Sequence, residues 1–394
     1  MEGPAFMLNP GPASASPQTL RALSTPVTYH NDPFFIERFR RAQDRLAQIL
    51  ETQHDVVLMQ GECMLGLEAA ARSLVWPGMR CLNLASGIYG KGMGMWLRSF
   101  GAEVIEIEVP FRDVVDPADV RRAFDEHPGI SLVTVVHSET PCGTLTAVQD
   151  IGPIAKEHGA LTLVDAASTL GGVPLRPDEW KLDVCVGASQ KCLGAPAGIS
   201  LMTVSDDAWG AMRANPDAPR ASILSLLDWK ELWLEQGKFP LTPSISDMYG
   251  VDAAFGEVLE IGVPRYFGRH ERAAAACRAG IAAMGLELFP RSADIASPCV
   301  TAIALPDEID DLQLCGHVRE RYGVVLGDSE GAGKIVRIGH MGIAARSFEP
   351  VVGLSALGRG LMDFGVEVSL GDGLEAAAMA VGEAALETVQ APSV

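Results

Sequence analysis

Residues 161–200 hold the side chains whose types and spacing best suit a chemical reaction. One apolar run ends on Asp165, and a second, residues 182–186, leads shortly into Lys191, which Gly and Pro residues follow directly. Taken singly, an Asp after a strand is usually a cap or turn residue, and a Lys is usually solvated. Placed together at two strand ends beside a Gly/Pro-rich loop, they favour a site in which the lysine is a nucleophile.

Short apolar runs alternate with amphipathic stretches in the first part of the chain, and they predict the elements that position these two side chains. Strands are expected at residues 54–59, 80–85, 103–108, 131–136 and 160–164, and helices at 64–75, 92–100, 116–126 and 148–158. This alternation is typical of βαβ units and of a mostly parallel, doubly wound sheet. Such sheets bind ligands at the carboxyl ends of their strands, where both side chains are expected.

The pattern changes after about residue 255. A helix is expected over 265–284, strand-like pieces at 300–305, 323–327 and 335–339, and helices near 348–364 and 373–388. Strands mixed with helices in this way predict a smaller α+β domain. We therefore expect an N-terminal segment (1–15) that contributes to the active site or the small domain, a large ligand-binding domain (16–255) and a small C-terminal domain (256–394).

Composition narrows the class of protein. The 394 residues include 31 Lys and Arg against 50 Asp and Glu, a net charge of −19, which disfavours nucleic acid and membrane surfaces as partners. The 48% hydrophobic content indicates a globular chain. The sequence has no recognisable signal peptide and no apolar run of the ~20 residues needed for a membrane span. The eight scattered cysteines form no CxxC pair, so we expect reduced thiols, no metal site and a cytoplasmic location.

Six motifs spread over nearly the whole chain carry a family resemblance. They are Asn9-Pro-Gly-Pro12, Ser86-Gly-Ile-Tyr-Gly90, Glu139-Thr-Pro-Cys-Gly143, Val164-Asp-Ala-Ala-Ser168, Ser189-Gln-Lys-Cys192 and Arg337-Ile-Gly-His-Met-Gly342. With them the chain resembles the class V, fold-type I aminotransferases of the pyridoxal-dependent superfamily, a group close to the alanine–glyoxylate aminotransferases. Within the family, the stretches QGECMLGLEAA, LASGIYGKGMG, KCLGAPAG, APRAS and RIGHMG are most similar to the pyridoxamine–pyruvate aminotransferases.

The resemblance implies a fold and roles at matching positions. The fold would be α/β, with a mostly parallel seven-stranded sheet between helices in the large domain and a smaller α+β C-terminal domain. Lys191 would form a Schiff base (an aldimine) with the aldehyde of the B6 compound and later move a proton. Asp165 would pair with the pyridine nitrogen, Tyr89 and Ala167 would lie on opposite faces of the ring, and Thr140 would reach the ring 3-hydroxyl.

The resemblance also implies how an oxo or amino acid would bind and how the chain would assemble. Arg337 would hold the substrate carboxylate through its bidentate guanidinium, and Arg346 would either assist it or be a solvated residue at a helix start. Pyruvate, glyoxylate and oxaloacetate all offer such a carboxylate. The family is built from dimers, so Thr242 would reach the active site of the other subunit in a homodimer or homotetramer.

The turn after the strand at 54–59 decides between two kinds of B6 ligand. Members of the family hold the phosphate of pyridoxal phosphate at this turn, where small residues expose the N–H groups of a helix N-terminus. Here the turn reads Gln60-Gly-Glu-Cys-Met64, with the carboxylate of Glu62 where the family usually has a small residue. At ~4 Å and an effective dielectric of ~20, each like-charge pair costs on the order of 4 kcal/mol. In the alternative, Glu62 points to solvent and interacts only with the helix dipole.

Two further positions bear on the phosphate in opposite directions. Many relatives donate a Tyr hydroxyl and a Thr hydroxyl to it, but here Phe239 stands in place of the Tyr, and Thr242 is kept. Gln190 is a residue that often contacts the phosphate in relatives. On balance we expect an unphosphorylated ring.

We therefore expect the B6 compound to be a substrate. Pyridoxamine and pyruvate would give pyridoxal and L-alanine, a step of vitamin B6 degradation with no separate cofactor. Glu62, with Tyr29, would hydrogen-bond the 5′-hydroxymethyl region, and Cys63 and Met64 are further expected ligand-binding positions. In the alternative, pyridoxal phosphate is a bound cofactor of an alanine or serine–glyoxylate type of aminotransferase.

Other classes of function fit the residues less well. The stretch GIYGKGMG (Gly87–Gly94) lacks both the GxGxxG spacing of a dinucleotide site and the GK[ST] ending of a P-loop. A binding module without activity would have no need for Lys191, Asp165 and Arg337 together. The two histidines that could act as acid or base, His30 and His340, are more simply structural.

Overall fold

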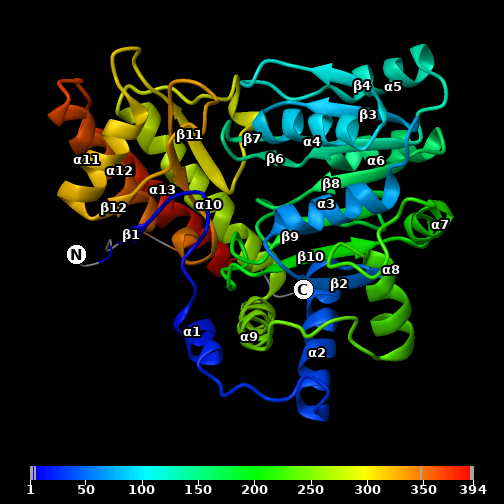
Figure 1. Cartoon of the computed structure of the whole chain (residues 1–394). Helices are drawn as coiled ribbons and strands as arrows, with labels where there is room; N and C mark the ends of the chain where they lie inside the picture. The colour runs from blue at the N-terminus through cyan, green and yellow to red at the C-terminus, as the bar shows by residue number, and fades with distance from the viewer. Residues whose placement is uncertain (1–2, 4–5, 347, 391–394) are drawn as a thin grey trace.

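A seven-stranded sheet forms the centre of the larger part of the molecule (Figure 1). The computed structural model describes residue 3 and residues 6–346 and 348–390. The strand order is β2 (Asp55–Gln60), β10 (Ile199–Val204), β9 (Val184–Ala188), β8 (Leu161–Asp165), β5 (Leu132–Val136), β3 (Arg80–Ala85) and β4 (Glu103–Glu108). Neighbours are parallel except that β10 runs antiparallel to both β2 and β9. The expected α/β fold with a mostly parallel sheet is therefore confirmed.

The helices between the strands cover the sheet. They are α3 (Cys63–Leu74), α4 (Ile88–Ser99), α5 (Pro117–Glu126), α6 (Val148–Glu157) and α7 (Asp206–Ala214). The helix expected at 92–100 begins four residues earlier, because the carboxylate of Glu139 accepts hydrogen bonds from two backbone N–H groups in the first turn of α4. That contact joins residues about fifty positions apart, so the local pattern does not contain it. The antiparallel strand β10 was also not predicted.

Two long helices that the sequence pattern did not reveal pack against each other below the sheet. Helix α2 (Pro33–Leu50) begins at the N-cap Asp32, and α9 (Ile245–Ile261) carries the buried Asp252. Asp252 accepts hydrogen bonds from two α2 side chains, Arg41 and Arg45, including a bond of 3.0 Å from Arg41 Nε. Two partners on one carboxylate make its burial tolerable. Shorter helical segments flank this pair: α1 (Pro17–Leu23), α8 (Leu226–Asp228) and the π-helical η1 (Trp229–Leu234).

The C-terminal part mixes helices with short strand pairs. Its helices are α10 (Val263–Ala283), α11 (Asp311–Tyr322), α12 (Glu349–Asp363) and α13 (Leu370–Gln390), with the 3₁₀ turns η2 (Ala293–Ile295) and η3 (Gly342–Ala345). Strand β11 (Val300–Ala304) pairs antiparallel with β13 (Ile335–Gly339), and the N-terminal β1 (Phe6–Met7) pairs parallel with β12 (Val324–Val325). A small hairpin, β6 (Ser138–Glu139) and β7 (Thr144–Leu145), projects from the sheet. The N-terminal segment thus joins the C-terminal part.

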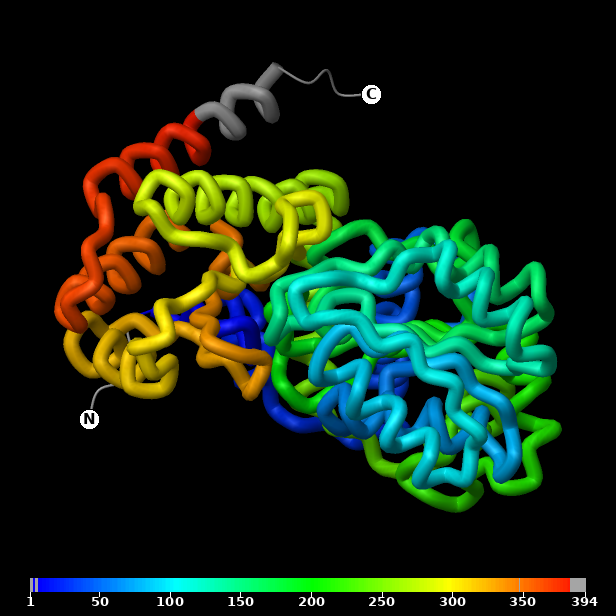
Figure 2. The backbone as a smooth tube through the Cα atoms, turned by 90° about the horizontal axis from the view of Figure 1, so that it is seen from above, coloured from blue at the N-terminus to red at the C-terminus, as the bar shows by residue number. Residues whose placement is uncertain are grey.

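The buried hydrophobic residues form two main clusters, one in the part that contains the seven-stranded sheet and one in the C-terminal part. Figure 2 shows these two parts from above. The larger surrounds the sheet, and the smaller includes Leu8 and side chains of α10 to α13. Helix α10 belongs to both, since Tyr266 packs into the larger cluster and Cys277 into the smaller. The division near residue 255 stays a prediction.

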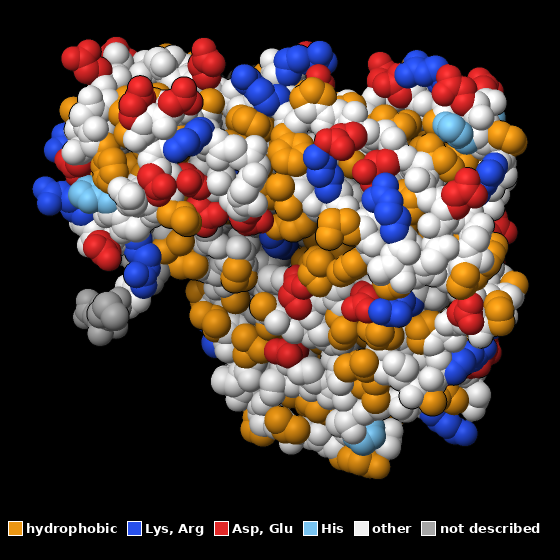
Figure 3. Space-filling view, turned by 45° about the horizontal axis from the view of Figure 1, so that its top comes forward, with side chains coloured by type: hydrophobic (Ala, Val, Ile, Leu, Met, Phe, Trp, Pro, Cys, Tyr) orange, Lys and Arg blue, Asp and Glu red, His pale blue; other side chains and the backbone are white. Residues whose placement is uncertain are grey.

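The described part of the chain contains no helix that is both long and apolar enough to cross a bilayer. No group of three or more His, Cys, Asp or Glu side chains in these residues is arranged to hold a metal ion. Figure 3 shows a hollow between the two parts, with a basic side chain inside it.

Candidate active site

Asp165 and Lys191 lie at the carboxyl edge of the sheet, as their positions in the sequence predicted. Asp165 is the last residue of β8, is 7% exposed, and accepts a 2.9 Å hydrogen bond from the backbone N–H of Ala167. Burial raises the pKa of Asp165 to about 6, the Ala167 N–H and the charge of Lys191 act to lower it, and the charge of Glu62 raises it further. A buried carboxylate of this kind can pair with a cationic group that enters from the open edge.

The N-terminal motif at residues 9–12 holds Lys191 in place. Lys191 Nζ donates a 2.9 Å hydrogen bond to the carbonyl oxygen of Pro10. Gly11 has φ of 105°, and a Cβ on it would lie 2.4 Å from Lys191 Cδ, so only glycine allows the two to pack this closely. The same segment is tied to the loop of Lys191 by a 2.7 Å bond from Ala13 N to the carbonyl oxygen of Gln190. The aliphatic stem of Lys191 is therefore restrained.

Tyr89 is positioned by Glu139, a residue that the sequence reasoning missed. The buried Glu139 carboxylate accepts hydrogen bonds from Tyr89 N at 3.1 Å and Gly90 N at 2.6 Å, at the start of α4. Burial raises the pKa of Glu139 to about 7, although the two backbone bonds lower it. A Cβ on Gly87 would lie 2.4 Å from Glu139 Cδ, so this glycine makes room for the carboxylate. An acid at the head of the ETPCG motif was the available signal.

Arg337 lies on β13 and faces the same region. It is 2% exposed, and its Nε donates to the carbonyl oxygen of Asp328 at 2.5 Å. Its Nη2 donates to Glu330 Oε1 at 2.6 Å, and its buried Nη1 has no hydrogen-bond partner among the described residues. The other oxygen of Glu330 accepts a 2.7 Å bond from the Tyr89 hydroxyl. Glu330, also missed from the sequence, thus bridges Tyr89 and Arg337.

Thr140 and Ala167 lie close to Asp165. Thr140 is buried, and its hydroxyl hydrogen-bonds to that of Ser168, three residues after Asp165. Ala167 is partly exposed and is held by the N–H that it donates to Asp165. A small side chain there leaves room for a flat group beside Asp165.

Glu62 is the N-cap of α3, and although its side chain is exposed, both carboxylate oxygens accept hydrogen bonds from neighbouring polar groups. Its Oε2 accepts a 2.9 Å bond from Met64 N, and its Oε1 accepts from Cys63 Sγ at 2.7 Å and from Gln190 Nε2 at 2.8 Å. Partial burial acts to raise the pKa of Glu62, but these hydrogen bonds together hold it below its ordinary value. Glu62 is therefore an anion at neutral pH. At the N-terminus of α3, the N–H of Met64 is therefore already bonded to a carboxylate of the same chain.

Three of the predicted residues, Tyr29, Thr242 and Arg346, make no hydrogen bond to this group within the described part of the chain. Tyr29 is 66% exposed, and its hydroxyl accepts from Asn31 Nδ2 at 2.9 Å. Thr242 is exposed in the loop before α9. Phe239, at the position where relatives have Tyr, stacks on Trp233 with ring centroids 4.0 Å apart.

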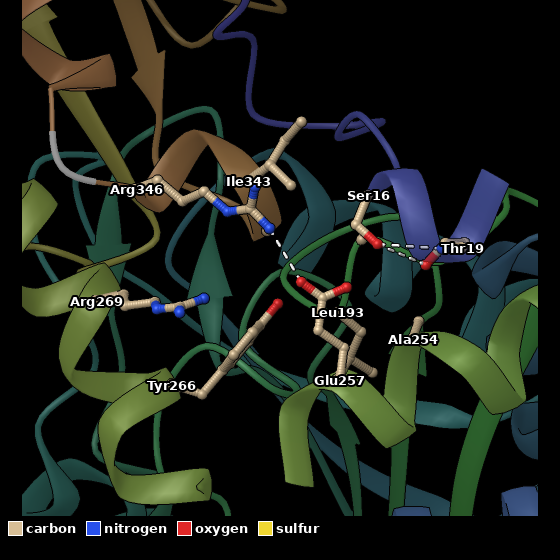
Figure 4. Close-up of a pocket in the computed structure, with 11 residues that line it drawn as sticks. Ser16, Thr19, Leu193, Ala254, Glu257, Tyr266, Arg269, Ile343 and Arg346 are labelled. Carbon is tan, nitrogen blue, oxygen red and sulfur yellow. Dashed lines mark hydrogen bonds and ion pairs between the residues drawn. The ribbon is translucent and has the colours of Figure 1, made fainter. Parts of the chain in front are cut away.

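Arg346, the third, lies in a separate small pocket (Figure 4). Its Nη2 donates to Glu257 Oε1 of α9 at 3.0 Å, and Arg269 and Tyr266 of α10 line the same pocket. The Tyr266 hydroxyl donates to the carbonyl oxygen of Cys192 at 2.8 Å, so the pocket borders the residue that follows Lys191.

The two histidines considered as acid or base groups have structural surroundings. His340 is buried, its Nε2 lies 2.8 Å from the hydroxyl of Thr301, and burial lowers its pKa to about 3. His30 packs edge-on against Tyr29.

Comparison with known proteins identifies related chains. The family model described as aminotransferase class-V matches residues 21–324. A pyridoxamine–pyruvate transaminase of Mesorhizobium japonicum is 42% identical over 376 residues, which are 95% of this chain and 96% of that one.

Solved structures with the same fold agree with this result. The crystal structure of pyridoxamine–pyruvate aminotransferase from Mesorhizobium loti superposes with a TM-score of 0.94 at 42% identity and covers 98% of each chain. That of ureidoglycine–glyoxylate aminotransferase from Bacillus subtilis has a TM-score of 0.91 at 30% identity and covers 97% of this chain and 99% of that one. The family resemblance read from the motifs is confirmed.

Proposed function

Because this chain belongs to the class-V aminotransferase family, we propose that it moves the amino group of free pyridoxamine to pyruvate, giving pyridoxal and L-alanine. The B6 compound is then a substrate and product of the enzyme and not a resident cofactor. The Mesorhizobium japonicum relative, which is named for this reaction, supports the proposal. The observation that carries it is the carboxylate of Glu62, which caps α3 and accepts hydrogen bonds from Met64 N and Gln190 Nε2.

Glu62 makes the N-terminus of α3 a poor place for a phosphate ester. Its carboxylate accepts the N–H of Met64 and the side-chain amide of Gln190, which are donors that a phosphate at this turn would need. A phosphate carries about −1.5 to −2 charges. Its repulsion by a carboxylate ~4 Å away is on the order of 4 kcal/mol per charge pair at an effective dielectric of ~20. A neutral hydroxymethyl group, in contrast, can donate a hydrogen bond to Glu62.

The other residues at the sheet edge suit the ring and its chemistry. The Lys191 amine, restrained by Pro10, is the nucleophile toward the ring aldehyde and the base that moves the proton. Asp165 holds the pyridine nitrogen in its protonated form, and this cation offsets the burial that raises the pKa of Asp165. The aromatic ring of Tyr89, fixed through Glu139, covers one face. The bound B6 ring supplies the electron sink.

The acceptor binds through Arg337. Its buried Nη1 is a donor without a partner among the described residues, and such a group gains most from a charged acceptor. The single carboxylate of pyruvate is such a charged acceptor, and the rest of the molecule is only a carbonyl and a small methyl group.

Tyr29 and Thr242 act in a neighbouring copy in this proposal. Both are exposed, and neither has a hydrogen bond to Glu62 or Lys191 among the described residues, as expected of residues that complete a second active site. The enzyme is then a homodimer, or a pair of dimers, in the cytoplasm. Its mass in solution by light scattering tests the assembly.

One preparation tests the central point. The protein is purified without added B6 compounds, dialysed, and analysed for bound phosphate ester and for conversion of pyridoxamine with pyruvate. We expect no retained phosphate ester and formation of pyridoxal and alanine. Stoichiometric pyridoxal phosphate that survives dialysis, with no turnover of pyridoxamine, would overturn the proposal in favour of a glyoxylate-type aminotransferase.

A further inference from the structure

The guanidinium of Arg337 is already partly engaged by groups of its own chain. Nε is bonded to the carbonyl oxygen of Asp328 and Nη2 to Glu330 Oε1, while the buried Nη1 has no partner among the described residues. A carboxylate binds a guanidinium best through two parallel bonds. Glu330 Oε1 occupies only one of the two N–H groups of Nη2, so a substrate carboxylate that pairs with Nη1 and Nη2 shares Nη2, and the charge of the guanidinium, with Glu330.

Glu330 is held in the site by contacts that do not involve Arg337. Its second oxygen, Oε2, accepts the 2.7 Å bond from the Tyr89 hydroxyl, which is independent of the bond to Arg337. Its backbone is also fixed, since Glu330 N donates to Asp328 Oδ1 at 2.9 Å and Ser329 N to Asp311 Oδ2 at 2.8 Å. The carboxylate therefore stays beside Tyr89 when an acceptor binds.

The charge of Glu330 is present at neutral pH. Its side chain is about 40% exposed. Partial burial acts to raise its pKa, but Arg337, the Tyr89 hydroxyl and the charge of Lys191 together hold it below the ordinary value. Arg346, the other cation expected for an acceptor, donates instead to Glu257. A second carboxylate on the acceptor would therefore meet an anion in this region.

We propose that Glu330 determines which 2-oxo acids the site accepts, by competing for Arg337 and by repelling any acceptor that carries a second carboxylate. The preferred class is the short monocarboxylic 2-oxo acids. This inference rests on the proposed function in one respect, because it takes Arg337 as the group that binds the acceptor. It does not depend on whether the amino donor is pyridoxamine or its phosphate.

The test compares acceptors that differ only in the second carboxylate. 2-Oxopentanoate and 2-oxoglutarate have the same chain length, and the ratio of their kcat/KM values measures the discrimination. Glu330→Gln keeps the size of the side chain and a hydrogen-bonding oxygen but removes the charge. We expect this variant to lower the ratio by about tenfold or more and to lower the KM for pyruvate several-fold. The proposal requires both the lower ratio of kcat/KM values and the lower KM for pyruvate.

A ratio that stays unchanged, or a pyruvate KM that rises, would overturn the inference, because Glu330 would then only position Arg337. Glu231→Gln is the matched control, since it removes a carboxylate bonded to Arg220 at 2.6 Å and 3.1 Å on the surface, and it should change neither quantity. Arg337→Lys separates the two levels of the argument. If it leaves the KM of every 2-oxo acid unchanged, the assignment of Arg337 in the proposed function is wrong. If it raises them while Glu330→Gln has no effect, only the role of Glu330 is wrong.

Discussion

Gln190 Nε2 donates a 2.8 Å hydrogen bond to Glu62 Oε1, which connects the residue before Lys191 to the N-cap of α3, 128 positions earlier in the chain. The two residues had opposite implications when read from the sequence, since Gln190 suggested a phosphate and Glu62 argued against one. The bond between them engages the amide of Gln190 with the carboxylate. The helix N-terminus, its acid and the loop of Lys191 form one polar unit.

Removing the carboxylate of Glu62 should admit a phosphate. In Glu62→Ala, Met64 N and the Gln190 amide lose their acceptor and become free to bind an anion. We expect the Kd for pyridoxamine 5′-phosphate to fall by about one to two decades, because solvent screens part of the ~4 kcal/mol repulsion. Titration followed by ring absorbance measures it.

The control for this variant lies on the same helix. Glu68→Ala removes a partly exposed acid paired with Arg72 at 2.7 Å and should leave the Kd unchanged. If Glu62→Ala also leaves it unchanged, Glu62 does not select against the phosphate.

Lys191→Ala should abolish chemistry but keep binding. The amine is the proposed nucleophile and proton carrier, so we expect turnover to fall by at least about 10²–10⁴-fold. Asp165 and Tyr89 remain, so the ring should still bind. Single-turnover assays and equilibrium titration separate the two effects.

Lys156→Ala removes an exposed lysine that pairs with Asp207, and it is the matched control for that experiment. Activity retained in Lys191→Ala at a level near that of this control would show that the nucleophile lies elsewhere.

Glu139 should make the stability of the protein depend on pH. Its pKa is about 7 in the folded state against 4.5 for the exposed carboxyl, so the folded protein binds the proton more tightly than the unfolded chain. The free energy of unfolding should therefore fall as the pH rises from 4.5 to 7, by about 3 kcal/mol from this group. The pKa of Asp165 is raised from 3.8 to about 6, so this group also lowers the free energy of unfolding as the pH rises between these two values.

Glu139→Gln isolates this contribution. The variant has no charge to bury, so its unfolding free energy should change less between pH 4.5 and 7 than that of the wild-type protein. Denaturation in urea at several pH values measures the slope. Equal slopes in the two proteins would mean that Glu139 does not titrate in this range.

Asp252→Asn should destabilise the protein without a direct effect on the site. The buried Asp252 accepts hydrogen bonds from Arg41 and Arg45, and its loss leaves two guanidinium groups poorly compensated. We expect a loss of about 3 kcal/mol in the free energy of unfolding. Asp207→Asn, which breaks an exposed pair with Lys156, should cost under ~1 kcal/mol. Similar losses in both variants would contradict the structural role of Asp252.

Local patterns predicted most of the sheet well. The strands expected at 80–85 and 103–108 have the same bounds in β3 and β4. Strands of this kind can be predicted because their apolar residues and the turn residues that bound them are close together in the sequence. Helix α2 was missed even though it has a regular N-cap at Asp32 followed by Pro33. Strand β10 was missed although it is as long as β3 and β4, and its antiparallel direction is not contained in the local pattern.

The sequence by itself determined the family, the kind of fold and the identity of Lys191, Asp165 and Arg337 as candidate groups, since motifs and strand ends are local properties. Only the tertiary structure decided which groups act on one another. Glu139 reaches Tyr89 across 50 positions, Glu330 reaches it across 241, and Gln190 reaches Glu62 across 128. Hydrogen bonds and charges depend on distance in space, and the sequence leaves that distance open until the sheet brings the strand ends together.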